Sequence, residues 1–193
     1  MTPGTDRVTE ADAGSRGRIV VRPLEAREAD AELVGEITDL VNEAYAVAES
    51  GLWRDGAHRT TAHEVAALVD RGEIVVATRD GSLDGSVRAH DVGDGVSEFG
   101  LLVSAPAHRG SGVGRALLDH VERQRRAAGA RTMRLELLVP RDWTHPGKEF
   151  LKDWYGRRGY RRVRVSSLDG GYPHLAPLLA TPCDLEIHEK PLD

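Results

Sequence analysis

The stretch from Glu98 to Ala128 strongly constrains what this chain folds into. It begins with an apolar segment and continues into a turn with three alternating glycines. A segment without further glycine or proline follows, and its apolar residues recur at the spacing of one helix face. After Gly129 an alternating apolar run, Met133 to Val139, is typical of a strand. We therefore predict a strand, a glycine turn, a helix and a second, parallel strand joined by a right-handed crossover.

The glycine turn, Gly110 to Gly114, is suited to binding a phosphate. At a helix N-terminus the backbone N–H groups are free and the helix dipole attracts anions, and glycine allows close approach without a Cβ. The turn is not a dinucleotide fingerprint, because Arg115 stands where the third glycine should be. Glu136 lies roughly where a ribose-binding acid would come, but inside an apolar strand. The Gly-Lys-Ser/Thr of a P-loop is absent as well. The alternative is a glycine-rich turn between strand and helix with no ligand.

Two motifs resemble one enzyme family. The pattern Arg109-x-x-Gly112-x-Gly114, directly after a strand, resembles the pyrophosphate loop of the GCN5-related N-acetyltransferases, the GNAT family. The segment Trp154 to Tyr160 resembles the family's tyrosine-x-x-x-glycine-aromatic ending. The resemblance extends over about residues 19–191.

Periodicity and turn signals predict eleven elements in the order β-α-α-β-β-β-α-β-α-β-β, which is the order of the GNAT fold. The resemblance thus implies an α/β (α+β) fold with a mixed, mostly antiparallel central sheet flanked by helices. Long loops are expected at 49–59 and 167–182. Residues 1–17 are polar and predicted to be a disordered tail, and residues 18–193 to form a single domain.

Composition limits the partners and the compartment. The net charge of −5 gives no reason to expect nucleic acid, and it is compatible with a cationic amine substrate. Membrane attachment is not expected, because no apolar run approaches roughly 18 residues. Cys183 is the single cysteine and the N-terminus lacks a signal-peptide core, so we expect a cytoplasmic protein. We expect it to be either a monomer or a homodimer. We expect no metal, since no second histidine follows His63-Glu64 at zinc-binding spacing.

The resemblance implies acetyl-CoA as co-substrate. The backbone of the central strand would pair with the pantetheine arm, and the glycine turn would bind the pyrophosphate. The residues expected to contact acetyl-CoA are Leu102, Val103, Ser104, Arg109, Gly110, Ser111, Gly112, Val113, Gly114, Arg115 and Lys148. Many family members carry an asparagine where this chain has Lys148. Either the lysine reaches a CoA phosphate instead, or this contact is absent.

The resemblance also implies two catalytic residues. Glu98 matches the position of a catalytic glutamate, and it would take a proton from the incoming ammonium through water. The alternative is a solvated or salt-bridged strand carboxylate. Tyr155 matches the general-acid tyrosine that protonates the leaving thiolate, because a tyrosine with a pKa of about 10 is protonated at neutral pH. The alternative is a tyrosine that only packs in the core.

The substrate pocket is harder to predict. The candidates for acceptor contacts are Tyr45, Trp53, Glu136 and His145, with Glu49, Arg54, Trp143, Tyr172 and His174 nearby in the same loops and strand ends. His145 is also a candidate second base. Each of them is as readily ordinary packing or surface.

The predicted activity is transfer of acetyl from acetyl-CoA to the primary amine of a small molecule, by direct attack in a ternary complex. Two alternatives stay open: a protein N-terminal or lysine acetyltransferase, and a non-catalytic acyl-CoA-binding module. The long loops favour a closed pocket, whereas a protein substrate needs an open groove.

Overall fold

The computed structural model describes residues 17–193 except 109 and 174. The predicted tail, apart from residue 17, and the candidates Arg109 and His174 lie outside the described residues. Seven strands form one sheet in the order β1-β2-β3-β4-β5-β7-β6. The strands are β1 (Ile19–Pro23), β2 (Ile74–Arg79), β3 (Ser82–Gly93), β4 (Val96–Ser104), β5 (Thr132–Pro140), β6 (Arg161–Ser167) and β7 (Cys183–Pro191). The α-helices are α1 (Ala31–Ala48), α2 (Ala62–Asp70), α3 (Val113–Ala127), α4 (Pro146–Arg157) and α5 (Leu168–Gly171).

The strand pairing confirms a mixed, mostly antiparallel sheet. β4 and β5 run parallel, as the crossover through α3 requires, and the other neighbouring pairs are antiparallel. Local sequence signals correctly predict where elements begin. Thr61 and Glu64 form the reciprocal capping box that opens α2. Within the described residues, no helix is both long and apolar enough to span a membrane.

The segment predicted as a loop at 167–182 contains more structure than expected. It holds the short helix α5 and a 3-10 turn, Ala176–Leu178. Leu168 is buried in a cluster with Leu138 and Leu185, which fixes α5 on the sheet. A helix of four residues is too short to produce a periodic pattern, and two of its residues are glycines, so the sequence indicated a loop.

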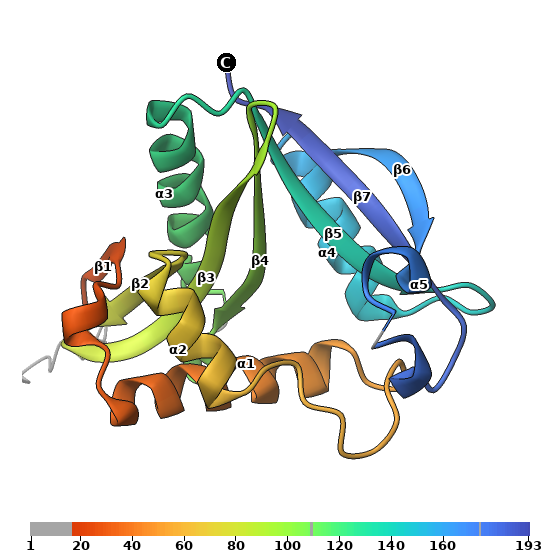
Figure 1. Cartoon of the computed structure of the whole chain (residues 1–193), viewed down its shortest axis with the longest axis horizontal. Helices are drawn as coiled ribbons and strands as arrows, with labels where there is room; N and C mark the ends of the chain where they lie inside the picture. The colour runs from red at the N-terminus through yellow and green to blue at the C-terminus, as the bar shows by residue number, and fades with distance from the viewer. Residues whose placement is uncertain (1–16, 109, 174) are drawn as a thin grey trace, which may run out of the picture.

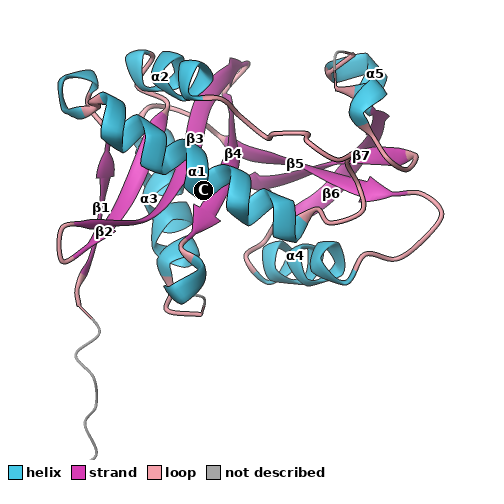
Figure 2. Cartoon of the chain, turned by 90° about the horizontal axis from the view of Figure 1, so that it is seen from below, coloured by secondary structure: helices cyan, strands magenta, loops and turns pink. Residues whose placement is uncertain are grey.

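Helices cover both faces of the sheet (Figure 2). α3 buries its apolar residues, Val113, Leu117, Leu118 and Val121, in a cluster with β2, β3 and β5. α4 lies on the same side as α3, while α2 and α5 lie on the other. α1 and α2 share a second cluster against β2 and β4.

β4 and β5 separate shortly after they begin to pair. They align at the three pairs Val96↔Thr132, Ser97↔Met133 and Glu98↔Arg134, and then diverge, as Figure 1 shows. The register between β3 and β4 shifts beside Val87, and Leu101 there has a φ of 49°. Such a bulge bends a strand. β4 therefore turns away from β5 and leaves a V-shaped opening in the sheet.

Candidate active site

A cavity of about 1010 Å³ lies where β4 and β5 separate. Its walls come from these strands, the glycine turn, the start of α4, the end of α1 and the two long loops. Of the predicted site residues, the lining includes Tyr45, Trp53, Leu102, Val103, Ser104, Gly110, Gly112, Val113, Gly114, Arg115, Glu136, His145, Lys148 and Tyr155. Glu98 and Ser111 are not part of the lining, and Arg109 lies outside the described residues. The fold thus brings residues that are far apart in sequence together in one cavity.

The glycines of the turn have different roles. Gly110 and Gly112 have φ values of 77° and 92°, a conformation that strains any residue with a Cβ. Gly114 lies in the first turn of α3, and a Cβ added there would meet no atom within 4 Å. Gly114 therefore leaves space in the cavity beside the free N–H groups of a helix N-terminus. This geometry fits a pyrophosphate group.

A buried carboxylate, that of Asp84, stabilises the glycine turn through hydrogen bonds to its neighbours. Asp84 is only 1% exposed, and its carboxylate binds Arg79 Nε at 2.8 Å and His108 Nδ1 at 2.6 Å. Arg79 also donates to Ser111 Oγ at 3.0 Å, so this hydroxyl is directed at Arg79. The sequence does not indicate this network, because Arg79, Asp84 and His108 carry no local motif and meet only in the fold.

The edge of β4 that faces β5 is open beyond Glu98. β3 pairs with the other edge of β4 as far as Ser104. In the part of the chain that the structure describes, no strand pairs with residues 100–104 on the β5 side. Alternate residues of a strand direct their N–H and C=O groups to the same edge. An extended ligand arm can pair with such an edge as a further strand would.

Lys148 does not point toward a phosphate in this structure. Its Nζ lies 2.7 Å from Glu49 Oε1, and the two side chains are only 3% and 6% exposed. Glu49 Oε2 accepts a hydrogen bond from Trp53 Nε1 at 2.5 Å. The ammonium expected to reach CoA is therefore paired inside the protein, because burial of the Glu49 carboxylate requires a cation. This pair joins the end of α1 to the start of α4.

Tyr155 is packed in the core and also borders the cavity. Its side chain is 7% exposed, and its ring packs near Phe99, Trp154 and Tyr160 at centroid distances of 5.8, 4.9 and 5.8 Å. It also lines the cavity. Burial, with a smaller effect of Tyr45, raises the pKa of Tyr155 far above its usual value. The hydroxyl is therefore a donor at neutral pH.

Glu98 is a half-buried carboxylate without an ion-pair partner among the described residues. Arg88 and Arg134 are nearby, but they bind Glu73 at 2.7 Å and Glu189 at 2.9 Å. Burial, and next the negative charge of Glu136, raise the pKa of Glu98 to about 7. A carboxylate with this pKa can accept a proton near neutral pH. The salt-bridged alternative finds no support in this geometry.

Two acceptor-side candidates have defined hydrogen bonds. Glu136 Oε2 accepts from the Tyr172 hydroxyl at 2.7 Å, and both residues line the cavity. His145 Nδ1 accepts from the backbone N–H of Gly147 at 3.0 Å and caps α4. Since this nitrogen already accepts a bond, the geometry disfavours His145 as a second base.

The part of the cavity lined by the acceptor candidates Trp53, Glu136 and Tyr172 is called the acceptor side. The two long loops hydrogen-bond to each other next to it. Arg54 N donates to Leu178 O at 2.9 Å, and Ala180 N donates to Leu52 O at 2.9 Å. Figure 1 shows this meeting of the chain after α1 with the chain after α5. Trp53 and Tyr172, one from each loop, line the cavity, so the bonded loops form one of its walls.

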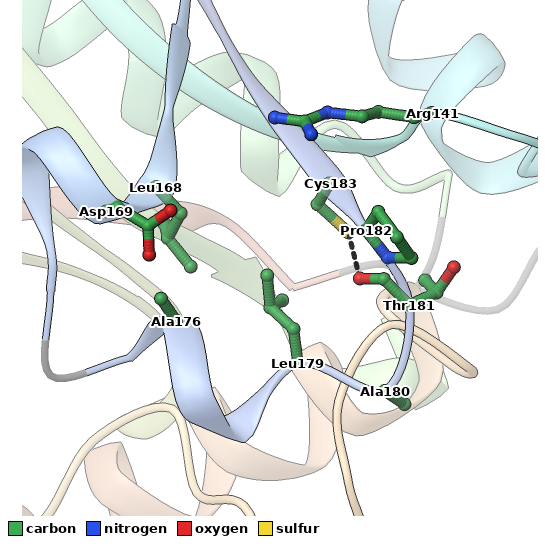
Figure 3. A pocket seen from close by; sticks show the side chains of 9 residues that line it. All are labelled: Arg141, Leu168, Asp169, Ala176, Leu179, Ala180, Thr181, Pro182 and Cys183. Atoms are coloured by element: carbon green, nitrogen blue, oxygen red, sulfur yellow. Dashed lines mark hydrogen bonds between the residues drawn. The ribbon is translucent and has the colours of Figure 1, made fainter.

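A smaller hollow of about 340 Å³ lies near the start of β7 and includes Cys183 (Figure 3). Cys183 Sγ donates to Thr181 O at 3.4 Å, and burial raises the pKa of this thiol to about 11. Arg141, on the rim, is bound to Asp184 at 2.6 Å. A thiol in this state is a poor nucleophile, so the large cavity is the candidate active site.

Known proteins similar to this chain are acetyltransferases. A profile described as an acetyltransferase (GNAT) domain matches residues 70–162. An aminoglycoside 6'-N-acetyltransferase solved with coenzyme A has a TM-score of 0.67 and 16% identity, covering 90% of this chain and 97% of that chain. The Salmonella typhimurium protein yncA, solved with its cofactor acetyl-CoA, has a TM-score of 0.64 and 18% identity, covering 91% and 94%.

A protein-modifying enzyme is similar as well. The ribosomal-protein-S18-alanine N-acetyltransferase from Escherichia coli has a TM-score of 0.63 and 15% identity, covering 91% of this chain and 95% of that chain. Comparison with curated proteins finds no significant match.

The splayed sheet, the glycine turn and the matching profile identify the class: the chain has the GNAT fold and contains an acetyltransferase (GNAT) domain, matched over residues 70–162. The family prediction made from the motifs at Arg109–Gly114 and Trp154–Tyr160 is confirmed. The relatives include enzymes named for small molecules and for proteins, so their names do not decide the class of acceptor.

Proposed function

We propose that this protein transfers the acetyl group of acetyl-CoA to the primary amine of a small molecule, by direct attack in a ternary complex. The observation that carries the proposal is the single cavity that extends from the glycine turn to Glu136 under the two bonded loops. One end suits a pyrophosphate, and the other is bounded by the two bonded loops, which favours a small amine over a protein chain.

Each residue has a defined task in the proposed reaction. The N–H groups of α3 and the turn hold the pyrophosphate, and the open edge of β4 aligns the pantetheine arm. Bound acetyl-CoA supplies the thioester. Glu98 takes a proton from the ammonium through water, which frees the nitrogen lone pair for attack at the carbonyl carbon. As the C–S bond breaks, the Tyr155 hydroxyl donates its proton to the sulfur. The second proton that the nitrogen loses as the amide forms returns, through solvent, to the Tyr155 phenolate.

Direct transfer is favoured over an acetyl-cysteine route. Cys183 is the only cysteine, and it lines the smaller hollow, where its thiol has a raised pKa. The large cavity therefore contains no thiol nucleophile of this chain.

A thiol-release assay with acetyl-CoA and a panel of small amines and peptides tests the proposal, with products identified by mass spectrometry. We expect CoA release and an acetylated amine, and little activity on peptides. Acetylation of peptides alone would support the protein-modifying alternative. Binding of acetyl-CoA by calorimetry without thiol release from any acceptor would indicate a non-catalytic module.

A further inference from the structure

Arg59 is a cation of the cavity wall that the proposed reaction does not use. Its guanidinium carbon lies 5.1 Å from the centroid of the Tyr45 ring, and both residues line the cavity. Asn42 Oδ1 accepts from the backbone N–H groups of Arg59 and Thr60 at 2.9 and 3.1 Å. The chain at this point is therefore held to α1, and the ring below supports the guanidinium.

The guanidinium of Arg59 has no carboxylate partner among the residues that the structure describes. Many other arginines of the chain do, including Arg79, Arg88 and Arg134. The nearby Glu49 is already bound by Lys148 at 2.7 Å. Because Lys148 and Glu49 cancel each other's charge, Arg59 is the positive group that this end of the cavity presents to a ligand.

A carboxylate also lines the acceptor side. Glu136 lines the cavity, and its Oε2 accepts from Tyr172 at 2.7 Å. Tyr172 is influenced by both kinds of charge. Burial and the neighbouring Glu136 raise its pKa above the usual value, with Glu98 adding to the effect and Arg59 opposing it. The acceptor side therefore combines a cation, Arg59, with the carboxylate of Glu136, and both are close enough to Tyr172 to act on its pKa.

We propose that the acceptor is a dipolar amine of the amino-acid type, whose ammonium faces Glu136 and reaches Glu98 through water, and whose carboxylate binds Arg59. This inference rests on the proposed function and adds its substrate class. Guanidinium and carboxylate match in a planar, two-bond geometry. A peptide N-terminus has the ammonium but no carboxylate beside it, so the same arrangement disfavours peptides.

Matched acceptors separate the carboxylate from the rest of the substrate. We would compare L-phenylalanine, L-phenylalaninamide and phenethylamine, and then L-leucine, L-leucinamide and isoamylamine, by kcat/KM in the thiol-release assay. For a hydrogen-bonded charge pair we expect the amino acid to exceed its partners on the order of 10- to 100-fold. These side chains suit the aromatic and aliphatic wall around Phe99 and Leu137.

Arg59→Met tests the residue itself, because methionine keeps an apolar stem over Tyr45 but removes the charge. We expect it to abolish the preference for the amino acid and to change kcat/KM for phenethylamine by less than about threefold. Arg54→Met is the control. Arg54 lies on the same loop and donates to Leu179 O at 3.2 Å, but it does not line the cavity. It should leave the preference intact. Arg59→Lys, which keeps the charge without the planar fork, should retain part of it.

Equal or better turnover of the carboxylate-free amines by the wild-type protein would overturn this inference while leaving the proposed function intact. So would an equal loss for all acceptors in a folded Arg59→Met protein. Thiol release from none of the acceptors, with acetyl-CoA bound, would instead overturn the proposed function and this inference with it.

Discussion

Glu98 owes its proposed role to its surroundings. Its neighbours Arg88 and Arg134 are bound to other carboxylates, and burial and Glu136 raise its pKa to about 7. The base form is the deprotonated one, so kcat/KM should rise with pH through about 7. Glu98→Gln should lose this inflection and about 10²–10⁴ in rate. The deficit should shrink toward the pKa of a free alkylamine, about 10.4, where unprotonated amine is available.

A pH–rate profile of both proteins with one amine checks this. Glu136→Gln is the matched comparison, because it removes the charge that raises the pKa of Glu98, and it should move the inflection to lower pH. Parallel profiles for the wild type and Glu98→Gln would show that Glu98 does not take the proton.

Tyr155→Phe should lower kcat and leave the KM for acetyl-CoA nearly unchanged, because the hydroxyl acts on the departing sulfur. The ring contacts with Phe99, Trp154 and Tyr160 remain, so thermal stability should change little. Tyr160→Phe is the control. Tyr160 is buried and donates to Glu122 at 2.8 Å, but it does not line the cavity. Removal of the Tyr160 hydroxyl should change the thermal stability but not the turnover. Wild-type turnover in Tyr155→Phe would leave Tyr155 with a packing role only.

The N-terminus of α3 separates ligand binding from helix stability. Gly114→Ala should stabilise the helix by up to about 1 kcal/mol, since alanine is the better helix former, yet weaken acetyl-CoA binding, because its methyl group enters the space beside the N–H groups. Gly35→Ala in α1 is matched, because its Cβ also meets no atom within 4 Å and it lies away from the cavity. Calorimetry and thermal melts on both variants measure this. Unchanged affinity in Gly114→Ala would contradict the predicted pyrophosphate site. Gly112→Ala is less informative, because its φ of 92° adds strain.

The buried pair between α1 and α4 should stabilise the fold. Lys148→Met leaves the Glu49 carboxylate buried without a cation and should cost about 3–5 kcal/mol in the free energy of unfolding. Adding Glu49→Gln should recover much of this loss, since the amide oxygen still accepts from Trp53. Denaturant unfolding of the single and double variants gives the coupling. A loss that is the same with and without Glu49→Gln would mean that the pair is not the reason.

The sheet at the centre of the molecule is divided into two halves, because β4 and β5 separate after three paired positions. A ligand bound between β4, α3 and α4 would contact both halves, so acetyl-CoA should stabilise the entire protein. At 100 times the dissociation constant the gain is about 2.7 kcal/mol. For a chain of this size this corresponds to a rise in Tm of roughly 5–11 °C. Thermal melts with and without acetyl-CoA measure it, and Gly114→Ala should show a smaller rise at the same concentration. An unchanged Tm for the wild type would argue against binding in the opening.

The sequence by itself determined the order of the elements and the place of the phosphate-binding turn. The apolar period of α3, the capping box at Thr61 and the glycines at 110 and 112 are properties of a few neighbouring residues, so they can be interpreted without the rest of the fold. The same holds for the two motifs that identify the family.

Only the tertiary structure decided what the charged side chains do. Lys148 binds Glu49, 99 positions away, whereas the sequence left open whether it reaches a CoA phosphate or makes no such contact. Asp84 anchors the turn through Arg79 and His108, which no local pattern around Asp84 indicates. No sequence motif marks Arg59 as a site residue. Only the packing shows that its positive charge lines the cavity without a carboxylate partner among the described residues. The physical reason is that ion pairing and desolvation depend on which distant residues the fold brings within a few ångströms, and a local pattern carries no information about that.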